Sequence, residues 1–151
     1  MTLSTTEQLT VTSARHTTGY LACGADAAPL LVFVHGWPEL SRSWRHQLPV
    51  FTALGFRCIA PDMRGYGRSS TYRRHEDFAQ ELIVADMLEL LESLGRERAV
   101  WIGHDWGGPV VWNIAAHPGA SPRTSSPRPR ATASLWRNTG RRRFPSRSGL
   151  I

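Results

Sequence analysis

The chain has 151 residues, and its 18 basic residues, all arginine, outnumber 12 acidic ones for a formal net charge of +6. This length predicts one domain that can bury a core of its own. The charge is uneven: residues 119–151 hold eight arginines and no acid, whereas residues 1–118 hold ten arginines and all 12 acids. The positive excess therefore belongs to the C-terminal tail and does not indicate a basic active site.

The N-terminus has neither the basic nor the apolar region of a signal peptide, and no apolar run approaches the length of a membrane span. Cys23 and Cys58 lie in separate apolar contexts without the spacing of metal ligands. We therefore expect reduced structural thiols, no metal, no cofactor and a soluble, cytoplasmic protein.

Two strands are expected first: an edge strand at residues 9–14, which alternate apolar and polar, and a weaker one at residues 16–22. Continuous apolar runs, typical of central strands in a parallel sheet, follow at residues 30–34, 56–60 and 99–103. Helical segments are expected between and after them, at residues 41–55, 76–94 and 106–117. This alternation predicts an α/β fold with a mostly parallel sheet and flanking helices in residues 1–118.

Residues 119–151 form a separate segment with four prolines, eight arginines and no strand or helix period. High charge and little apolar surface predict disorder. Two explanations stay open: a basic arm that binds phosphate-rich surfaces without sequence preference, or translation in a shifted frame. We favour the shifted frame, because the composition changes abruptly after a well-formed helix, and we expect no specific nucleic-acid partner.

A nucleophile-elbow pattern stands after the strand at 99–103, where residues 103–107 read Gly-His-Asp-Trp-Gly. Small residues flank the nucleophile of such an elbow because the turn leaves no room for side chains, and here Asp105 holds the nucleophile position. A carboxylate at the start of a helix is stabilised by the helix dipole and free N–H groups, so Asp105 should be ionised. The alternative is that Asp105 only caps the helix.

A second motif, His35-Gly36-Trp37-Pro38, follows the strand at 30–34, at the sheet edge where α/β proteins bind ligands. Together with the elbow and the loop at residues 61–70, Pro-Asp-Met-Arg-Gly-Tyr-Gly-Arg-Ser-Ser, it resembles the α/β-hydrolase superfamily. Within it the chain is similar to the epoxide hydrolase group, which pairs an H-G-x-P loop with an Asp nucleophile. The resemblance covers residues 9–118, the N-terminal half of such a protein.

The resemblance implies a role for each motif residue. Asp105 would attack a small-molecule epoxide and form an ester that water then cleaves to a diol. The backbone N–H groups of Trp37 and Trp106 would form the oxyanion hole. His35, Gly36 and Pro38 would shape the loop, with a cis peptide bond before the proline as one option. His104 should point away from the nucleophile and serve a structural role.

Haloalkane dehalogenation is the alternative chemistry, because that group also uses an Asp at this elbow followed by a tryptophan. We favour epoxide hydrolysis because the segment Trp37-Pro38 matches its loop better. A non-catalytic fragment with a nucleic-acid-binding tail is a further alternative.

The sequence after Asp105 contains one histidine, His117, and neither an acid nor a tyrosine. His117 lies twelve residues along the predicted helix, about 18 Å away, and cannot reach the nucleophile. We therefore expect a truncated chain that lacks the base, its acid partner and the cap domain, and that does not turn over. We also expect its elbow strand to be an exposed edge, with poor solubility or dependence on a partner. Substrate identity and oligomeric state are not predicted.

Overall fold

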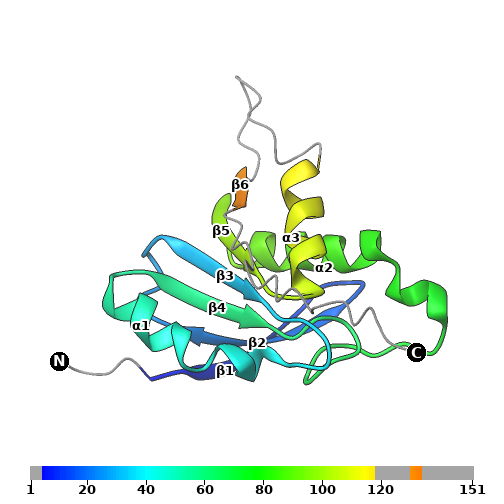
Figure 1. Ribbon diagram of the computed structural model, residues 1–151, viewed down its shortest axis with the longest axis horizontal. Helices are drawn as coiled ribbons and strands as arrows, with labels where there is room; N and C mark the ends of the chain where they lie inside the picture. The colour runs from blue at the N-terminus through cyan, green and yellow to red at the C-terminus, as the bar shows by residue number, and fades with distance from the viewer. Residues whose placement is uncertain (1–4, 118–129, 134–151) are drawn as a thin grey trace, which may run out of the picture.

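A mixed six-stranded sheet carries the fold of the computed structural model, which describes residues 5–117 and 130–133 (Figure 1). The spatial order of its strands is β1-β2-β4-β3-β5-β6. Strands β4, β3, β5 and β6 are parallel neighbours, whereas β2 pairs antiparallel with β1 and β4. The strands are β1 (Glu7–Thr12), β2 (Thr17–Cys23), β3 (Leu30–Val34), β4 (Arg57–Pro61), β5 (Arg98–Gly103) and β6 (Arg130–Ala133). The predicted mostly parallel sheet is confirmed, whereas the antiparallel pairing of β2 with β1 and β4 is a feature that the sequence did not predict.

The three predicted helical segments are present, and two of them are divided. The helices are η1 (Ser41–Trp44), α1 (Gln47–Ala53), η2 (His75–Phe78), α2 (Gln80–Ser93) and α3 (Gly107–Ala116). Extended backbone at Ala79, with ψ of 143°, separates η2 from α2. Among the residues described above, no helix has the length and apolar character needed to cross a bilayer.

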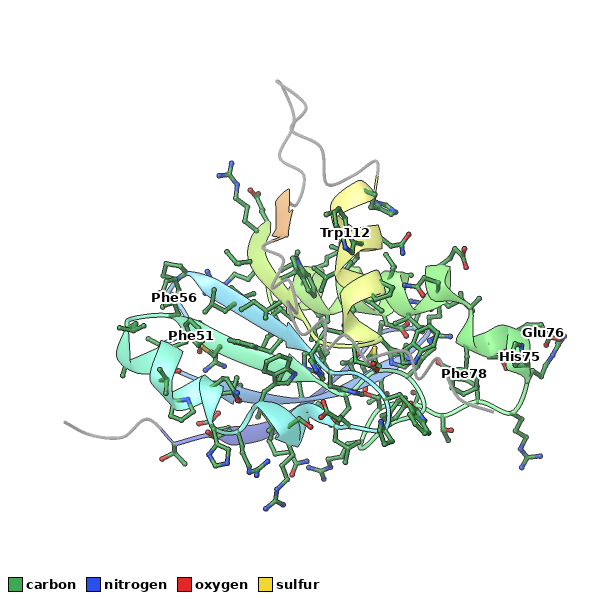
Figure 2. The ribbon with its side chains drawn as sticks, in the orientation of Figure 1. Phe51, Phe56, His75, Glu76, Phe78 and Trp112 are labelled. Atoms are coloured by element: carbon green, nitrogen blue, oxygen red, sulfur yellow. The ribbon has the colours of Figure 1, made fainter. Side chains whose placement is uncertain are left out.

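Strand β3 is buried on both faces, as its continuous apolar run predicts. Leu30, Val32 and Val34 face one core cluster, which they share with apolar side chains of α2 and α3. Leu31 and Phe33 face a second cluster beneath α1. Helices therefore cover both sides of the central strands (Figure 1), and the aromatic rings of α1 and the following turn close the second cluster (Figure 2).

Strand β6 belongs to the segment after residue 118. Residues 130–133 pair in parallel with residues 98–101 of β5, so β5 is not an open edge along that stretch. An unpaired strand presents N–H and C=O groups that any extended backbone can satisfy, and these four residues do so. The predicted disorder of residues 119–151 stays a prediction, because only residues 130–133 of that segment lie among the described residues.

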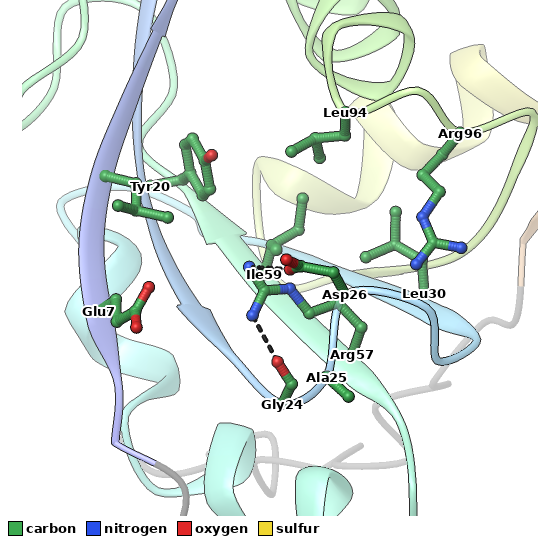
Figure 3. A pocket seen from close by; sticks show the side chains of 11 residues that line it. Glu7, Tyr20, Gly24, Ala25, Asp26, Leu30, Arg57, Ile59, Leu94 and Arg96 are labelled. Carbon is green, nitrogen blue, oxygen red and sulfur yellow. Dashed lines mark hydrogen bonds and ion pairs between the residues drawn. The ribbon is translucent and has the colours of Figure 1, made fainter.

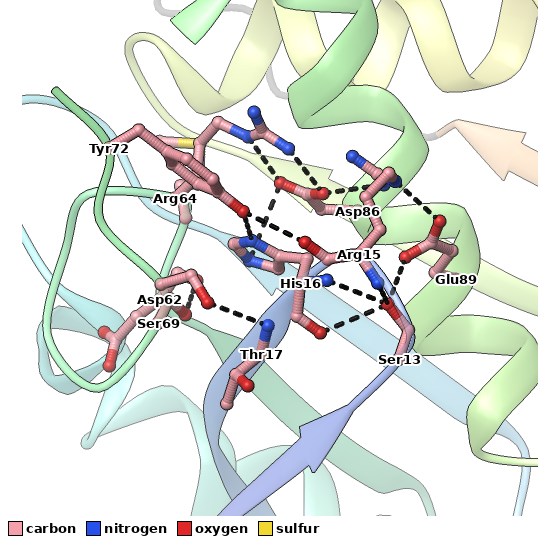
Figure 4. A network of polar contacts seen from close by, with 12 residues as sticks. Ser13, Arg15, His16, Thr17, Asp62, Arg64, Ser69, Tyr72, Asp86 and Glu89 are labelled. Carbon is pink, nitrogen blue, oxygen red and sulfur yellow. Dashed lines mark hydrogen bonds and ion pairs between the residues drawn. The ribbon is translucent and has the colours of Figure 1, made fainter. Parts of the chain in front are cut away.

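A buried charge network joins three segments of the fold (Figure 4). Asp86 of α2 is 1% exposed, and Arg64, from the loop after β4, binds both of its carboxylate oxygens at 2.6 and 2.7 Å. Arg15, from the β1–β2 turn, binds the same carboxylate at 2.8 Å and also Glu89 at 2.9 Å. The network thus fixes the hairpin and the β4 loop to α2.

We expect Asp86→Ala to be strongly destabilising, because it leaves the buried Arg64 guanidinium without its carboxylate. Removing one partner of a buried ion pair costs about 3–5 kcal/mol of unfolding free energy. Urea denaturation measures the loss, with Glu92→Ala, at an exposed position near the end of the same helix, as the control. Exposed substitutions change stability by about 0.5 kcal/mol or less. Equal losses in the two variants would contradict a structural role for the network.

Candidate active site

The turn after β5 raises one carboxylate above the sheet. Asp105 has a φ of +51°, a left-handed conformation that non-glycine residues rarely adopt. A Cβ on Gly103 would lie 2.4 Å from the carbonyl oxygen of Gly107, and a Cβ on Gly107 would lie 2.3 Å from the carbonyl oxygen of Val34. Real Cβ atoms essentially never approach so closely, so both positions require glycine. The turn has the geometry that the elbow pattern predicts.

The loop after β3 meets this turn, because β3 and β5 are parallel neighbours and their carboxyl ends share one sheet edge. A Cβ on Gly36 would lie 2.4 Å from the Cβ of Asp105, so the two loops touch through a glycine. The backbone N–H of Trp37 donates to Oδ1 of Asp105 at 3.0 Å. The peptide bond between Trp37 and Pro38 is cis, the option that the resemblance left open.

These contacts set the charge of the carboxylate. Hydrogen bonds from the backbone N–H groups of Trp37 and then Trp106 lower the pKa of Asp105, and nearby His104 lowers it further. A carboxylate whose charged form accepts N–H bonds stays ionised at neutral pH. The two donors named for the oxyanion hole are thus both directed at the side chain of Asp105.

The side chain of His35 supports the loop after β3 from the protein core. Its ring is fully buried, and the backbone N–H of Met63 donates to Nε2 at 3.0 Å. Nε2 must therefore be unprotonated, so Nδ1 carries the hydrogen and donates to the carbonyl oxygen of Gly36 at 2.8 Å. Burial lowers the pKa of His35, which preserves this neutral form. The buried His35 ring thus connects the loop after β3 to the backbone after β4.

Both tryptophans beside Asp105 face solvent, Trp37 with 66% and Trp106 with 61% of its surface exposed. His104 is also exposed, and its Nδ1 lies 3.6 Å from Oε2 of Glu39. Trp112 adds a further exposed indole on α3 (Figure 2). The described residues therefore leave the carboxylate on an open apolar surface.

A pocket of about 590 Å³ lies at the other end of the parallel strands, next to the first residues of β3 and β4 (Figure 3). Leu30 and Arg57, the first residues of β3 and β4, contribute to its lining. Arg57 is occupied there by the carbonyl oxygen of Gly24 and the carboxylate of Asp26. This pocket is separate from Asp105, which follows the carboxyl end of β5.

Stability should fall in mild acid, because burial lowers the pKa of both His35 and His16 below the ordinary value of 6.5. The unfolded chain then binds protons that the folded chain does not. The free energy of unfolding is therefore at its full value above pH 6.5 and decreases as the pH falls towards the lowered pKa values. Urea denaturation at about pH 7.5 and pH 5.5 tests this dependence. His35→Asn should weaken it and His46→Gln, at an exposed position, should not; identical stability at both pH values would refute it.

The two glycines that open α3 provide a matched pair. Gly107→Ala should cost about 2 kcal/mol or more, because its Cβ would meet the backbone of β3. A Cβ on Gly108 meets nothing beyond its chain neighbours, and because Pro109 follows, Gly108→Ala should change stability by about 1 kcal/mol or less. Thermal or urea denaturation separates the two, and similar effects of both substitutions would show that the close contact with β3 is wrong.

Comparisons with known proteins agree with this architecture. The sequence model of the family described as "alpha/beta hydrolase fold" matches residues 29–123. Epoxide hydrolase A of Mycobacterium tuberculosis is 49% identical over 90 residues, which are 60% of this chain and 28% of that protein. Bifunctional epoxide hydrolase 2 of Mus musculus is 47% identical over 89 residues, 59% of this chain and 16% of that protein.

Solved structures give the same result. Epoxide hydrolase A from Mycobacterium thermoresistibile has a TM-score of 0.72 and 41% identity, covering 76% of this chain and 36% of that one. An epoxide hydrolase from an endophytic Streptomyces has a TM-score of 0.71 and 38% identity, covering 74% and 33%. The chain spans between about a sixth and a quarter of the length of the two curated relatives named above. With its elbow, its cis-proline loop and these matches, the chain belongs to the α/β-hydrolase family and is similar to its epoxide hydrolases.

Proposed function

We propose that Asp105 is a nucleophile that opens the ring of a small-molecule epoxide, as in an epoxide hydrolase. The observation that carries this proposal is the hydrogen bond from the Trp37 N–H to Oδ1 of Asp105. That bond keeps the carboxylate ionised and fixes its orientation at an exposed turn. A residue that merely caps α3 would not require a contact from the neighbouring β3 loop.

The two carboxylate oxygens take different roles in this proposal. Oδ1 stays with the Trp37 N–H, and the other oxygen of Asp105 attacks an epoxide carbon. A carbon–oxygen ester bond forms, the epoxide C–O bond breaks, and the released alkoxide takes a proton from water. Oδ1 becomes the carbonyl oxygen of the ester. The N–H groups of Trp37 and Trp106 would then stabilise the negative charge that builds on it when water attacks.

The hydrolytic half of the reaction needs a base that activates water. After Asp105 the sequence offers only His117, which follows the last residue of α3, about 18 Å along the helix from the turn. We therefore propose that this 151-residue chain, assayed alone, performs ring opening once and retains the ester.

Haloalkane dehalogenation remains the second candidate because Trp106 follows the nucleophile with an exposed indole. The named relatives are epoxide hydrolases, which favours the epoxide. A bromoalkane offered in parallel separates the two chemistries through the release of bromide.

Incubation with a reactive terminal epoxide should increase the intact mass by one epoxide per chain, and peptide mapping should locate the adduct at Asp105. Asp105→Asn should form no adduct, whereas Asp26→Asn, at a carboxylate that is 92% exposed and remote from the turn, should react normally. The rate should be independent of pH around neutrality, because the pKa of Asp105 is lowered.

Two results would contradict this proposal. If Asp105→Asn formed the adduct in the same yield as the unchanged protein, Asp105 would not be the nucleophile. Catalytic release of diol by the chain alone would show that ring opening is followed by hydrolysis, so that the base is present after all.

A further inference from the structure

The only two cysteines of the sequence are brought face to face by the sheet. Cys23 is the last residue of β2 and Cys58 the second residue of β4, and the two are direct partners in the antiparallel pairing of these strands. Side chains of directly opposed residues project from the same face of a sheet. Both thiols accordingly belong to the same core cluster, with Leu31 and Leu48 among its members. Sequence spacing gave no indication of this pairing.

The register also fixes how far apart the two Cα atoms lie. The N–H of Asp62 donates to the carbonyl oxygen of Gly19 at 2.8 Å, one position before the Tyr20–Pro61 pair, so this position has the bonding direction of a hydrogen-bonded pair, although the N–H of Gly19 itself donates to Oγ of Ser69. Hydrogen-bonded and non-bonded pairs alternate along antiparallel strands, so Cys23 and Cys58, four positions further on, are again a hydrogen-bonded pair. The Cα atoms of such a pair lie about 5.5 Å apart. Disulfides span Cα separations of about 4.4–6.8 Å, so the backbone is already in range.

The expected Cβ–Cβ distance of the pair fits a disulfide less well than its Cα–Cα distance does. Cβ atoms of opposed residues lie about 4.5–5.5 Å apart, and the wider values belong to hydrogen-bonded pairs, whereas a disulfide prefers about 3.8 Å. Closing the bond therefore requires the two strands to adjust by roughly an ångström. A disulfide formed under such strain is more easily reduced than a relaxed one. The pair is suited to reversible oxidation.

Burial protects the thiols in the resting protein. Both are almost fully buried, no disulfide joins them, and burial raises the pKa of Cys58, with a further increase from the neighbouring Cys23. Each cysteine lies at or next to the end of its strand, however, where local opening costs least. Helix α1, which covers this cluster through Leu48, has only seven residues. Small oxidants can thus reach the pair through local opening of this corner.

We propose that Cys23 and Cys58 form a reversible redox site that closes into an intramolecular disulfide in the presence of a low-molecular-weight disulfide such as oxidised glutathione. One protein thiolate attacks the glutathione disulfide, forms a mixed disulfide and releases one glutathione. The second protein thiolate attacks the protein sulfur of the mixed disulfide and releases the second glutathione. Two protein thiols are oxidised and one external disulfide is reduced, and the two protons lost by the protein thiols are taken up by the two leaving glutathione thiolates.

This site is independent of the proposed nucleophile. The cysteine pair lies toward the amino end of β4, whereas Asp105 lies beyond the carboxyl ends of β3 and β5. Oxidation should therefore act on the stability of the sheet and leave ring opening at Asp105 intact. Failure of either proposal does not affect the other.

The test is the equilibrium between thiols and disulfide in glutathione redox buffers, approached from both the reduced and the oxidised protein. The effective concentration of one thiol for the other should be at least about tenfold higher in the folded chain than in concentrated urea, because the fold holds the pair together. Tryptic cleavage after arginine should yield one linked species of residues 16–42 and 58–64. The oxidised protein should keep the near-UV circular dichroism of the reduced one.

Single variants give the controls. Cys23→Ser and Cys58→Ser should each take up at most one glutathione and yield no linked peptides. An effective concentration in the folded chain that is equal to or below that in urea would overturn the proposal, because the fold would then not favour the bond. So would links between different molecules, or a disulfide that appears only with loss of the folded spectrum.

Discussion

The hydrogen bond between the Trp37 N–H and the Asp105 carboxylate depends on two backbone segments that touch. It forms only because β3 and β5 are parallel neighbours and release their loops at the same edge. Gly36 is the contact point, since any side chain there would overlap Asp105. His35, held by the backbone after β4, supports the loop from inside the core. Sheet order, glycine positions and a buried neutral histidine thus combine to orient one carboxylate.

The strands and the turn at Asp105 could be predicted from the sequence because each depends on residues that are close together along the chain. The pattern around Asp105 reflects contacts within one turn, and apolar runs mark the strands that carry the loops. The buried network was missed, because a helix-period argument treats Asp86 as a surface position. Its burial depends on Arg64, which the fold brings from another loop. The opposition of Cys23 and Cys58 is likewise set by strand register, which spacing along the chain does not encode.

The carboxyl ends of the parallel strands differ in character from the rest of the sheet. The proposed chemistry lies at the carboxyl ends of the parallel strands, where the Asp105 carboxylate has a lowered pKa and the indoles of Trp37 and Trp106 are exposed. Away from these ends lie the features that determine stability, namely the charge network on α2 and the cysteine pair at the start of β4. The matched region of the family extends across both. The proposed oxidation of the cysteine pair would therefore act away from Asp105, whereas protonation of His35 would act directly beneath the loop that contacts Asp105.

Titration of the Asp105 carboxyl carbon by NMR tests the central claim most directly, together with the amide proton of Trp37. The account predicts a pKa below the ordinary value of 3.8 and a Trp37 amide shift that follows the same midpoint. A pKa at or above 3.8, with a Trp37 amide that does not respond, would show that the β3 loop does not hold the carboxylate.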